Sequence, residues 1–334
     1  MATPIANTLR TPIGRLAPSP TGTLHLGNAR SFLLAWLSIR QQNGTLVLRI
    51  EDIDSPRVKS GAVQSTIDDL RWLGLDWDFG PDMHDGRVQG VSVTQSQRLS
   101  RYREVLLKAH SRWTSLSMRC TRSQIAQAAA SAPHELGLSQ LEGPIYPGTC
   151  RNRLSETSRS FFFSEADPAA LRWAFSDGEM TWFDGLLGPQ KADPSKQLGD
   201  YVIGRATGQP SYQLAVVVDD QDMGVDEVVR GDDLVVSTYR QLALLKHLGW
   251  DVPKYYHVPL VLDADGRRMA KRQGDSLSFF REQNESPQAI IGYLAYSLNL
   301  IPKPKPYSPQ DLVGKLDWQR IPKLPTKFTG RFSF

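Results

Sequence analysis

The sequence contains very little cysteine. Only Cys120 and Cys150 occur among its 334 residues. Two thiols are too few for the disulfide framework of a small secreted protein, and they are consistent with a reducing compartment. A scaffold held together by disulfides is therefore excluded.

Long apolar runs are also missing. No stretch approaches the roughly 20 apolar residues that a membrane-spanning helix requires. The first thirty residues contain Pro, Thr and Arg, and they lack the apolar core of a signal peptide. We therefore expect no membrane association and a cytoplasmic location. The 40% hydrophobic and 22% charged residues are typical of a globular protein. A length of 334 residues predicts one large domain with one or two appendages.

Two further absences narrow the function. The sequence has no internal repeat, and no G-x-G-x-x-G follows a strand-like segment, which excludes a Rossmann dehydrogenase. The net charge is only +4, but residues 301–334 contain five Lys and two Arg against two Asp, a net charge of +5. This tail, with Tyr307 and Trp318, predicts either a surface that follows a phosphodiester backbone or a solvated segment.

The apolar pattern of the first third predicts alternating elements. Residues 29–42 have helical spacing and end at Asn43-Gly44, residues 45–54 (TLVLRIEDID) resemble a strand, and residues 61–73 predict a second helix. Strand, helix and strand in this order predict a βαβ unit and a parallel sheet.

The rest of the chain predicts an interrupted continuation of this sheet. Residues 111–160 are rich in Ser, Ala, Pro and Gly and are interpreted as an insertion. QLAVVVDD (213–220) predicts a returning parallel strand, and residues 236–248 predict a helix. Residues 258–274 (VPLVLDADGRRMAKRQG) predict a strand, a turn at Asp265-Gly266 and a basic loop. Helices and the proline-spaced PKPKPYSP segment complete the chain.

The segment PSPTGTLHLGN indicates a phosphate site at the start of a helix. In open α/β sheets, ligands collect where strands end and helices begin, and helix N-termini favour anions. Gly22 and Gly27 allow close approach of the backbone to a ligand. His25 and Asn28 can both donate hydrogen bonds to a phosphoryl oxygen. The alternative is a turn with a purely structural histidine.

A second basic element supports the phosphate interpretation. RRMAKR (267–272) follows the predicted turn and presents four cations. Lys271 could neutralise charge on the phosphates of a reacting nucleotide. Taken alone, the loop could simply be solvated. Two such elements flanking one parallel sheet indicate a nucleotide site.

These motifs together resemble those of the class I aminoacyl-tRNA synthetases that use glutamate. RLAPSPTGTLHLGNAR is similar to their HIGH-containing segment, and RMAKR takes the place of their KMSKS loop. LRIEDID and VVVDDQDMGVDEVVRGDDL are similar to the glutamyl members in particular. The resemblance extends from Arg15 to Gly274, except in the insertion.

The resemblance implies an α/β fold. Its expected parts are a Rossmann-like parallel sheet with helices on both faces, an insertion domain and a small helical C-terminal domain that resembles a stem-contact domain. The expected boundaries are 1–110 for the first half of the catalytic domain, 111–160 for the insertion, 161–262 for the second half with the glutamate site, and 263–334 for the KMSKS-like loop and the basic C-terminal region.

The resemblance also implies roles for individual residues. The expected catalytic residues are His25 and Lys271. The expected glutamate-binding residues are Arg15, Leu16, Ala17, Pro18, Ser19, Glu51, Tyr212 and Arg230. The expected ATP-binding residues are Pro18, Ser19, Thr21, Gly22, His25, Gly27, Asn28, Met269 and Lys271.

The chemistry of the glutamate-binding residues agrees with this implication. A side-chain carboxylate requires a guanidinium fork, which Arg15 or Arg230 can offer. The α-ammonium group requires an anion, and Glu51 lies at the end of a predicted strand. The alternative for Arg230 and Glu51 is a structural ion pair.

Length indicates which glutamate enzyme the chain resembles. About sixty residues follow Lys271, too few for a separate anticodon-binding domain. The chain is therefore similar to the short glutamyl-Q tRNA(Asp) synthetases. This implies activation of L-glutamate with ATP and Mg²⁺ to glutamyl-adenylate, transfer to queuosine in the anticodon of tRNA(Asp), and a monomer. Unstacked anticodon bases are the usual targets of specific RNA recognition.

Two alternatives stay open at this point. The chain could be a truncated glutamyl-tRNA synthetase that charges tRNA(Glu), or a catalytically silent RNA-binding paralogue. The presence of all the expected site residues argues against the silent paralogue.

The chain departs from the family pattern at a zinc site. Many short members have a Cys-x-Cys pair, a tyrosine and a further cysteine. Here Cys120, Tyr146 and Cys150 match, but Met118 stands in the first position, and a thioether is a poor zinc ligand. His134 could supply a fourth ligand, but we expect that the metal has been lost.

The two signature motifs also differ slightly from the pattern. Ala270 replaces the KMSKS serine, and Asn28 stands in the last place of the HIGH motif. We expect that neither difference abolishes glutamate activation.

Overall fold

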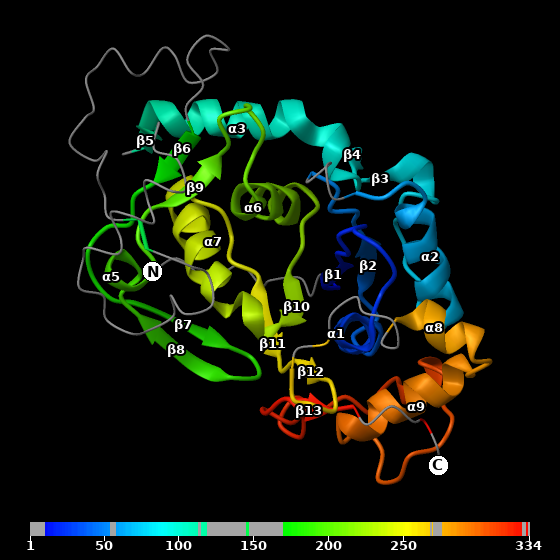
Figure 1. Ribbon diagram of the computed structural model, residues 1–334. Helices are drawn as coiled ribbons and strands as arrows, with labels where there is room; N and C mark the ends of the chain where they lie inside the picture. Colours follow the sequence, from blue (N-terminus) through cyan, green and yellow to red (C-terminus); the bar gives the residue numbers. More distant parts are fainter. Residues whose placement is uncertain are drawn as a thin grey trace, which may run out of the picture. The chain divides into compact units, whose positions relative to one another are not determined.

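The computed structural model describes most of the chain (Figure 1). Its residues form two compact units. The described residues are 11–53, 58–112, 115–118, 145–146, 170–267, 269, 276–328 and 332. The first unit comprises Met1–Val93, Gly224–Gly231 and Pro253–Phe334, and the second comprises Thr94–Met223 and Asp232–Val252.

The first unit contains four adjacent parallel strands. They are β1 (Ile13–Leu16), β2 (Thr45–Leu48), β10 (Glu227–Gly231) and β11 (Lys254–Val258), in the order β2-β1-β10-β11. Residues of β1, β2 and β10 are almost all buried, as expected for parallel strands. The predicted parallel sheet is confirmed.

Helix α1 (Leu26–Arg40) packs on β1, β2 and β10. It begins three residues before the predicted helix, because His25 forms its N-cap. The contact with β1 is close: a Cβ atom on Gly14 would lie 2.3 Å from Cγ1 of Ile39. Only a residue without a side chain fits at this point of β1.

The remaining elements of the first unit lie around this sheet and in the C-terminal part. They are α2 (Ala62–Trp72), β3 (Arg87–Val88), β4 (Val91–Ser92), β12 (Val261–Leu262), α8 (Leu277–Glu282), α9 (Pro287–Ser297) and β13 (Thr326–Lys327). Strands β12 and β13 pair in parallel, and β3 and β4 form a hairpin.

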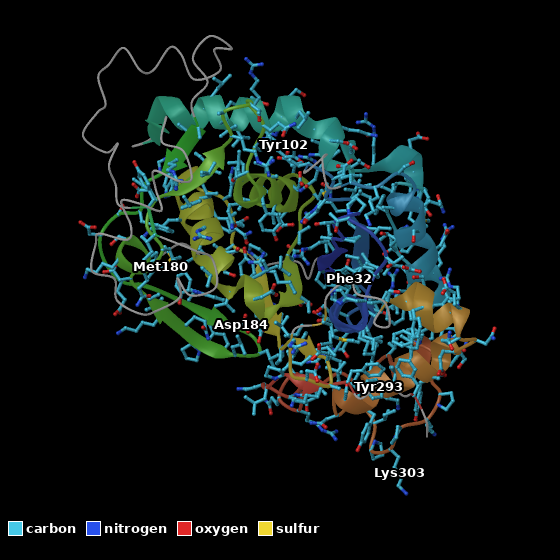
Figure 2. All side chains as sticks on the ribbon, viewed as in Figure 1. Phe32, Tyr102, Met180, Asp184, Tyr293 and Lys303 are labelled. Atoms are coloured by element: carbon cyan, nitrogen blue, oxygen red, sulfur yellow. The ribbon has the colours of Figure 1, made fainter. Side chains whose placement is uncertain are left out.

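The C-terminal part has an aromatic core of its own. Phe280, Tyr293, Phe328 and Phe332 contact one another with ring centroids 4.8 to 5.8 Å apart, and Tyr293 is labelled in Figure 2. The PKPKPYSP segment follows α9 without regular structure, and it packs back on that helix. A Cβ atom on Gly292 would overlap the carbonyl oxygen of Lys305.

The second unit contains an antiparallel sheet, a hairpin and helices. The sheet has the order β5 (Ser115–Met118), β6 (Ala170–Trp173) and β9 (Tyr201–Gly204), and β7 (Met180–Asp184) pairs with β8 (Gly188–Ala192). The helices are α3 (Leu99–Arg112), α5 (Pro194–Gln197), α6 (Tyr212–Asp222) and α7 (Val235–Leu248). Helix α7 confirms the helix predicted at residues 236–248.

The strand predicted at residues 213–220 is wrong, because this segment lies within helix α6. The hydroxyl of Ser211 caps the helix by accepting from the amide of Leu214. Asp219, which is fully buried, accepts hydrogen bonds from Tyr102 at 2.7 Å and from Gln95 at 2.6 Å. A short apolar run with three valines does not distinguish a buried strand from a buried helix, and tertiary packing overrides β-propensity here.

The predicted insertion at residues 111–160 lies largely outside the described residues. Of the helices in the described ranges, none combines the length and the apolar character that a membrane span requires.

The fit of Gly14 against Ile39 predicts a stability effect. Gly14→Ala should lower the free energy of unfolding by about 1 to 3 kcal/mol, because the new methyl group overpacks the contact between strand and helix. Chemical denaturation measures the change. The control is Ile39→Ala, alone and combined with Gly14→Ala. If the cost of Gly14→Ala is the same in both backgrounds, the close contact is not its cause.

Candidate functional site

The site lies where the connections of the parallel sheet diverge. From β1 the chain passes through α1 to β2 on one side, whereas β10, on the other side of β1, is followed by β11 farther out. Ligands of open α/β sheets bind at such a switch point, beyond the carboxyl ends of the strands. Residues 17–28, which follow β1, therefore lie at the expected place.

Two arginines lie on the neighbouring strands at this point. Arg15 of β1 donates from Nη1 to the carbonyl oxygen of Val229 at 3.1 Å. Arg230 of β10 donates from Nε to Nε2 of His257, its in-register neighbour on β11, at 3.0 Å. Its guanidinium also lies 5.2 Å from the ring centroid of Tyr255. Both arginine side chains are buried, so each is held in a defined orientation.

Glu51 lies beside the segment that follows β1. The amide of Arg49 donates to the carbonyl oxygen of Leu16 at 2.8 Å, and the amide of Glu51 donates to that of Pro18 at 3.1 Å. The backbone pairing between β1 and β2 thus continues beyond the ends of both strands. The Glu51 carboxylate forms an ion pair with Arg49, with Nη2 and Oε1 3.0 Å apart. Sequence reasoning missed Arg49, because an arginine within an apolar run carries no signal of its partner.

His25 and Asn28 form a reciprocal cap at the start of α1. Nδ1 of His25 accepts from the amide of Asn28 at 3.3 Å, and Oδ1 of Asn28 accepts from the amide of His25 at 3.2 Å. Because Nδ1 acts as an acceptor, the proton of the neutral imidazole lies on Nε2. His25 can therefore donate from Nε2 while it also stabilises the helix. The two interpretations of this histidine are compatible.

The glycines of this segment have different functions. Gly22 has φ of 140°, a conformation that residues with a side chain rarely adopt. A Cβ atom on Gly27 would lie 3.0 Å from Nδ1 and from Cε1 of His25. The first glycine permits the turn, and the second leaves room for the imidazole.

The residues from Leu16 to Asn28 differ in their exposure to solvent. Leu16 and Pro18 are buried, whereas Ala17 is half-buried and Ser19 is exposed. The expected ATP-binding residues Thr21, Gly22, His25, Gly27 and Asn28 are all half-buried. Partial exposure is what a surface that contacts a ligand requires.

Both ends of the basic loop are anchored near this segment. At the start of the loop, the amides of Gly266 and Arg267 donate to Asp263, and the amide of the buried Met269 donates to the carbonyl oxygen of Val261 at 3.3 Å. After the loop, Ser276 pairs with His25 in an antiparallel bridge. The structure thus brings both flanks of the KMSKS-like loop to the first unit. Lys271 itself lies outside the described residues.

Arg30, the last residue of TLHLGNAR, has a structural function. It is 1% exposed, and it donates from Nη2 to the carbonyl oxygen of Pro259 and from Nη1 to Oγ1 of Thr326, both at 2.9 Å. Arg30 thereby joins α1, which begins within this motif, to β13.

Tyr212 is the first residue of α6 and belongs to the second unit, whereas the other described glutamate-site residues belong to the first. Its place in the glutamate site stays a prediction.

The expected zinc residues are only partly described. Cys120, His134 and Cys150 lie outside the described residues, and only the strand position of Met118 is defined. Tyr146 is buried with its ring centroid 4.5 Å from the Arg172 guanidinium. Among the described residues, no group of three His, Cys, Asp or Glu could hold a metal ion.

The basic C-terminal tail presents its charges to solvent. Its exposed cations are Lys303, Lys305, Lys315, Arg320, Lys323 and Lys327. Figure 2 shows Lys303 extending away from the ribbon. Trp318 stacks on Tyr256 with ring centroids 4.1 Å apart, and Lys305 lies over the ring of Tyr307. Contact of this tail with a phosphodiester backbone stays a prediction.

Comparison with known proteins agrees with this geometry. The family model for the catalytic domain of class I tRNA synthetases (E and Q) matches residues 12–299. The Glutamyl-Q tRNA(Asp) synthetase of Symbiobacterium thermophilum is 46% identical over 315 residues, which cover 94% of this chain and 95% of that protein. The chain belongs to the glutamyl-Q tRNA(Asp) synthetase family.

Two further comparisons concern longer members of class I. The glutamate–tRNA ligase of Geobacter sulfurreducens is 35% identical over 92% of this chain, which spans 62% of that protein. The crystal structure of glutamate–tRNA synthetase from Elizabethkingia anophelis has a TM-score of 0.79 over 96% of this chain and 68% of that one, at 24% identity. This likeness confirms the α/β fold of class I synthetases. The protein is a ligase of the synthetase type, and class I synthetases use ATP with Mg²⁺.

The N-cap position of His25, together with its expected catalytic role as an Nε2 donor, predicts that two substitutions will differ in this synthetase. His25→Asn keeps a favourable N-cap and should change the free energy of unfolding by less than about 0.5 kcal/mol, whereas His25→Ala should cost about 1 kcal/mol. Both variants lose the Nε2 donor, so both should lower the rate of ATP–pyrophosphate exchange about 100-fold. Denaturation and exchange kinetics measure the two effects. Full exchange activity in His25→Asn would show that the histidine is only a cap.

Proposed function

We propose that the synthetase activates L-glutamate with ATP and transfers it to queuosine in the anticodon of tRNA(Asp). The observation that carries this proposal is the pair of buried guanidinium groups, Arg15 and Arg230, on the adjacent strands β1 and β10, with the capped His25 in the segment that follows β1. A site for a carboxylate substrate thus adjoins a helix N-terminus that suits phosphate. The proposed acceptor is the one in the name of the S. thermophilum relative, glutamyl-Q tRNA(Asp) synthetase.

In the proposed activation step, glutamate binds through two of its three charged groups, and the third, the α-carboxylate, reacts. Arg15 or Arg230 holds the side-chain carboxylate, and Glu51 holds the α-ammonium group. An oxygen of the α-carboxylate attacks the α-phosphorus of ATP, and the bond to pyrophosphate breaks. The Nε2–H of His25, the N-terminus of α1 and Lys271 stabilise the charge that develops on the phosphates.

In the proposed transfer step, a hydroxyl group of queuosine attacks the acyl carbon of glutamyl-adenylate. The new bond is an ester, AMP leaves with the bonding electrons, and the hydroxyl proton passes to the released phosphate or to solvent. Anticodon bases that are unstacked can enter a catalytic pocket, whereas bases within a helix cannot.

The second candidate function is the charging of tRNA(Glu), which the 35% identity with the Geobacter ligase favours. The acceptor distinguishes the two. We expect the purified protein with ATP and labelled glutamate to label tRNA(Asp) only when that tRNA carries queuosine, and the label to be released by mild alkali. Label on tRNA(Glu), or on tRNA(Asp) that lacks queuosine, would contradict the proposal.

Glutamate-dependent ATP–pyrophosphate exchange separates both candidates from the silent paralogue. We expect exchange with glutamate and none with glutamine. If no exchange occurs even when tRNA is present, the protein does not activate an amino acid.

Arg230→Ala should raise the KM for glutamate at least about tenfold, because it removes a charge-assisted hydrogen bond that is worth about 1.5 to 3 kcal/mol. The KM for ATP should change less than about twofold if Arg230 contacts only glutamate. The control is Arg71→Ala, which removes an exposed ion pair with Asp82 and should leave both constants unchanged. An unchanged KM for glutamate in Arg230→Ala would remove Arg230 from the glutamate site.

A further inference from the structure

Asp69 is a buried carboxylate that belongs to neither signature motif. It lies on α2, and only 2% of its surface is exposed. A buried carboxylate is costly to desolvate and is retained where specific partners compensate for that cost. Burial does raise the pKa of Asp69 above its usual value, while the amide of Leu24 and the guanidinium of Arg281 oppose this shift.

The two oxygens of Asp69 bind two different elements. Oδ2 accepts from the amide of Leu24 at 3.3 Å, and Oδ1 accepts from Nη2 of Arg281 at 3.2 Å. Arg281 is itself oriented by the ring of Trp72, 4.7 Å from its Cζ, and by the carbonyl oxygen of Asp68 at 3.3 Å. One side chain of α2 thus joins the segment before α1 to helix α8.

These two elements flank the expected ATP site. Leu24 directly precedes the N-cap His25, and α8 begins directly after the KMSKS-like loop. They also pair with each other, because the amide of Leu277 donates to the carbonyl oxygen of Leu24 at 2.8 Å and Ser276 bridges to His25. Asp69 contacts one residue of each paired element, Leu24 before α1 and Arg281 on α8.

We propose that Asp69 is a positioning residue for the ATP step, which holds the His25 turn in register with the segment that leaves the basic loop. The proposal rests on the proposed function only in that the ATP site is the one described above. Without the carboxylate, the amide of Leu24 loses its acceptor and Arg281 loses its counter-ion. His25 and the end of the loop can then shift relative to each other.

Four variants test this arrangement. Asp69→Ala removes both contacts. Asp69→Asn keeps an oxygen that can accept from Leu24 but loses the charge that pairs with Arg281, and Arg281→Gln removes the partner. The matched control is Asp68→Asn, because Asp68 is the exposed neighbour on α2 and its carboxylate accepts from Gln64.

The expected kinetic result is selective for ATP. In glutamate-dependent ATP–pyrophosphate exchange, Asp69→Ala should lower kcat/KM for ATP about tenfold, since a displacement of a positioning group by a fraction of an ångström has effects of this order. The KM for glutamate should change less than about twofold, because the arginines expected to bind glutamate lie on β1 and β10 and not on the elements that Asp69 joins. Asp69→Asn should be intermediate, and Asp68→Asn should equal the wild type. The double variant Asp69→Asn with Arg281→Gln should be no worse than the more affected single variant.

A second measurement does not depend on activity. Hydrogen exchange followed by mass spectrometry should show faster exchange in both 22–28 and 276–282 for folded Asp69→Ala, and in neither segment for Asp68→Asn. If the wild type shows no pyrophosphate exchange, the proposed function fails, whereas coupled loss of protection still supports the positioning by Asp69. Unchanged protection in both segments, or equal changes in the constants for glutamate and ATP, would overturn this inference.

Discussion

The structure of the site depends on the parallel pairing of β1 between β2 and β10. This pairing places Arg15 next to β10, and its continuation past the end of β2 sets Glu51 beside Pro18. It also leaves β1 directly beneath α1, where only glycine fits at position 14. The chain passes from β1 to β2 on one side of β1 and from β10 to β11 on the other, in opposite directions across the sheet. The loop between β1 and His25 therefore lies at the switch point of the strand order. The strand order thus places the end of β1 and the N-terminus of α1 at the switch point of the sheet.

Buried cations are a second constraint on this unit. Arg15 donates to a backbone carbonyl group, Arg30 to a carbonyl and a hydroxyl group, and Arg230 to the imidazole of His257. These hydrogen bonds fix the orientation of each guanidinium group, and Arg49 forms an ion pair with Glu51. Positive charge held in a fixed geometry at a strand end suits the carboxylate and phosphate groups of the expected substrates.

Several features could be predicted because they follow from local patterns. The spacing of apolar residues predicted the helix that begins within TLHLGNAR, the helix at 236–248 and the parallel sheet. The two signature motifs identified the family. The helical nature of 213–220 was not recognisable, since a run of valines between polar residues fits either state. Tertiary contacts decide that this segment is a helix. Tyr102 and Gln95, 117 and 124 residues away in the sequence, donate hydrogen bonds to Asp219. Patterns of neighbouring residues cannot predict contacts between residues so far apart in the sequence.

The sequence by itself determined which chemical groups are present: the histidine–glycine turn, the basic loop and the arginines and acid that suit glutamate. It determined the family for the same reason, because motifs are short and local. Tertiary structure alone decided how these groups are oriented. It placed Arg15 against Val229, Arg230 against His257, and Asp69 against Leu24 and Arg281. These relations join residues of different strands and helices, and such distances become fixed only when the sheet and its covering helices pack.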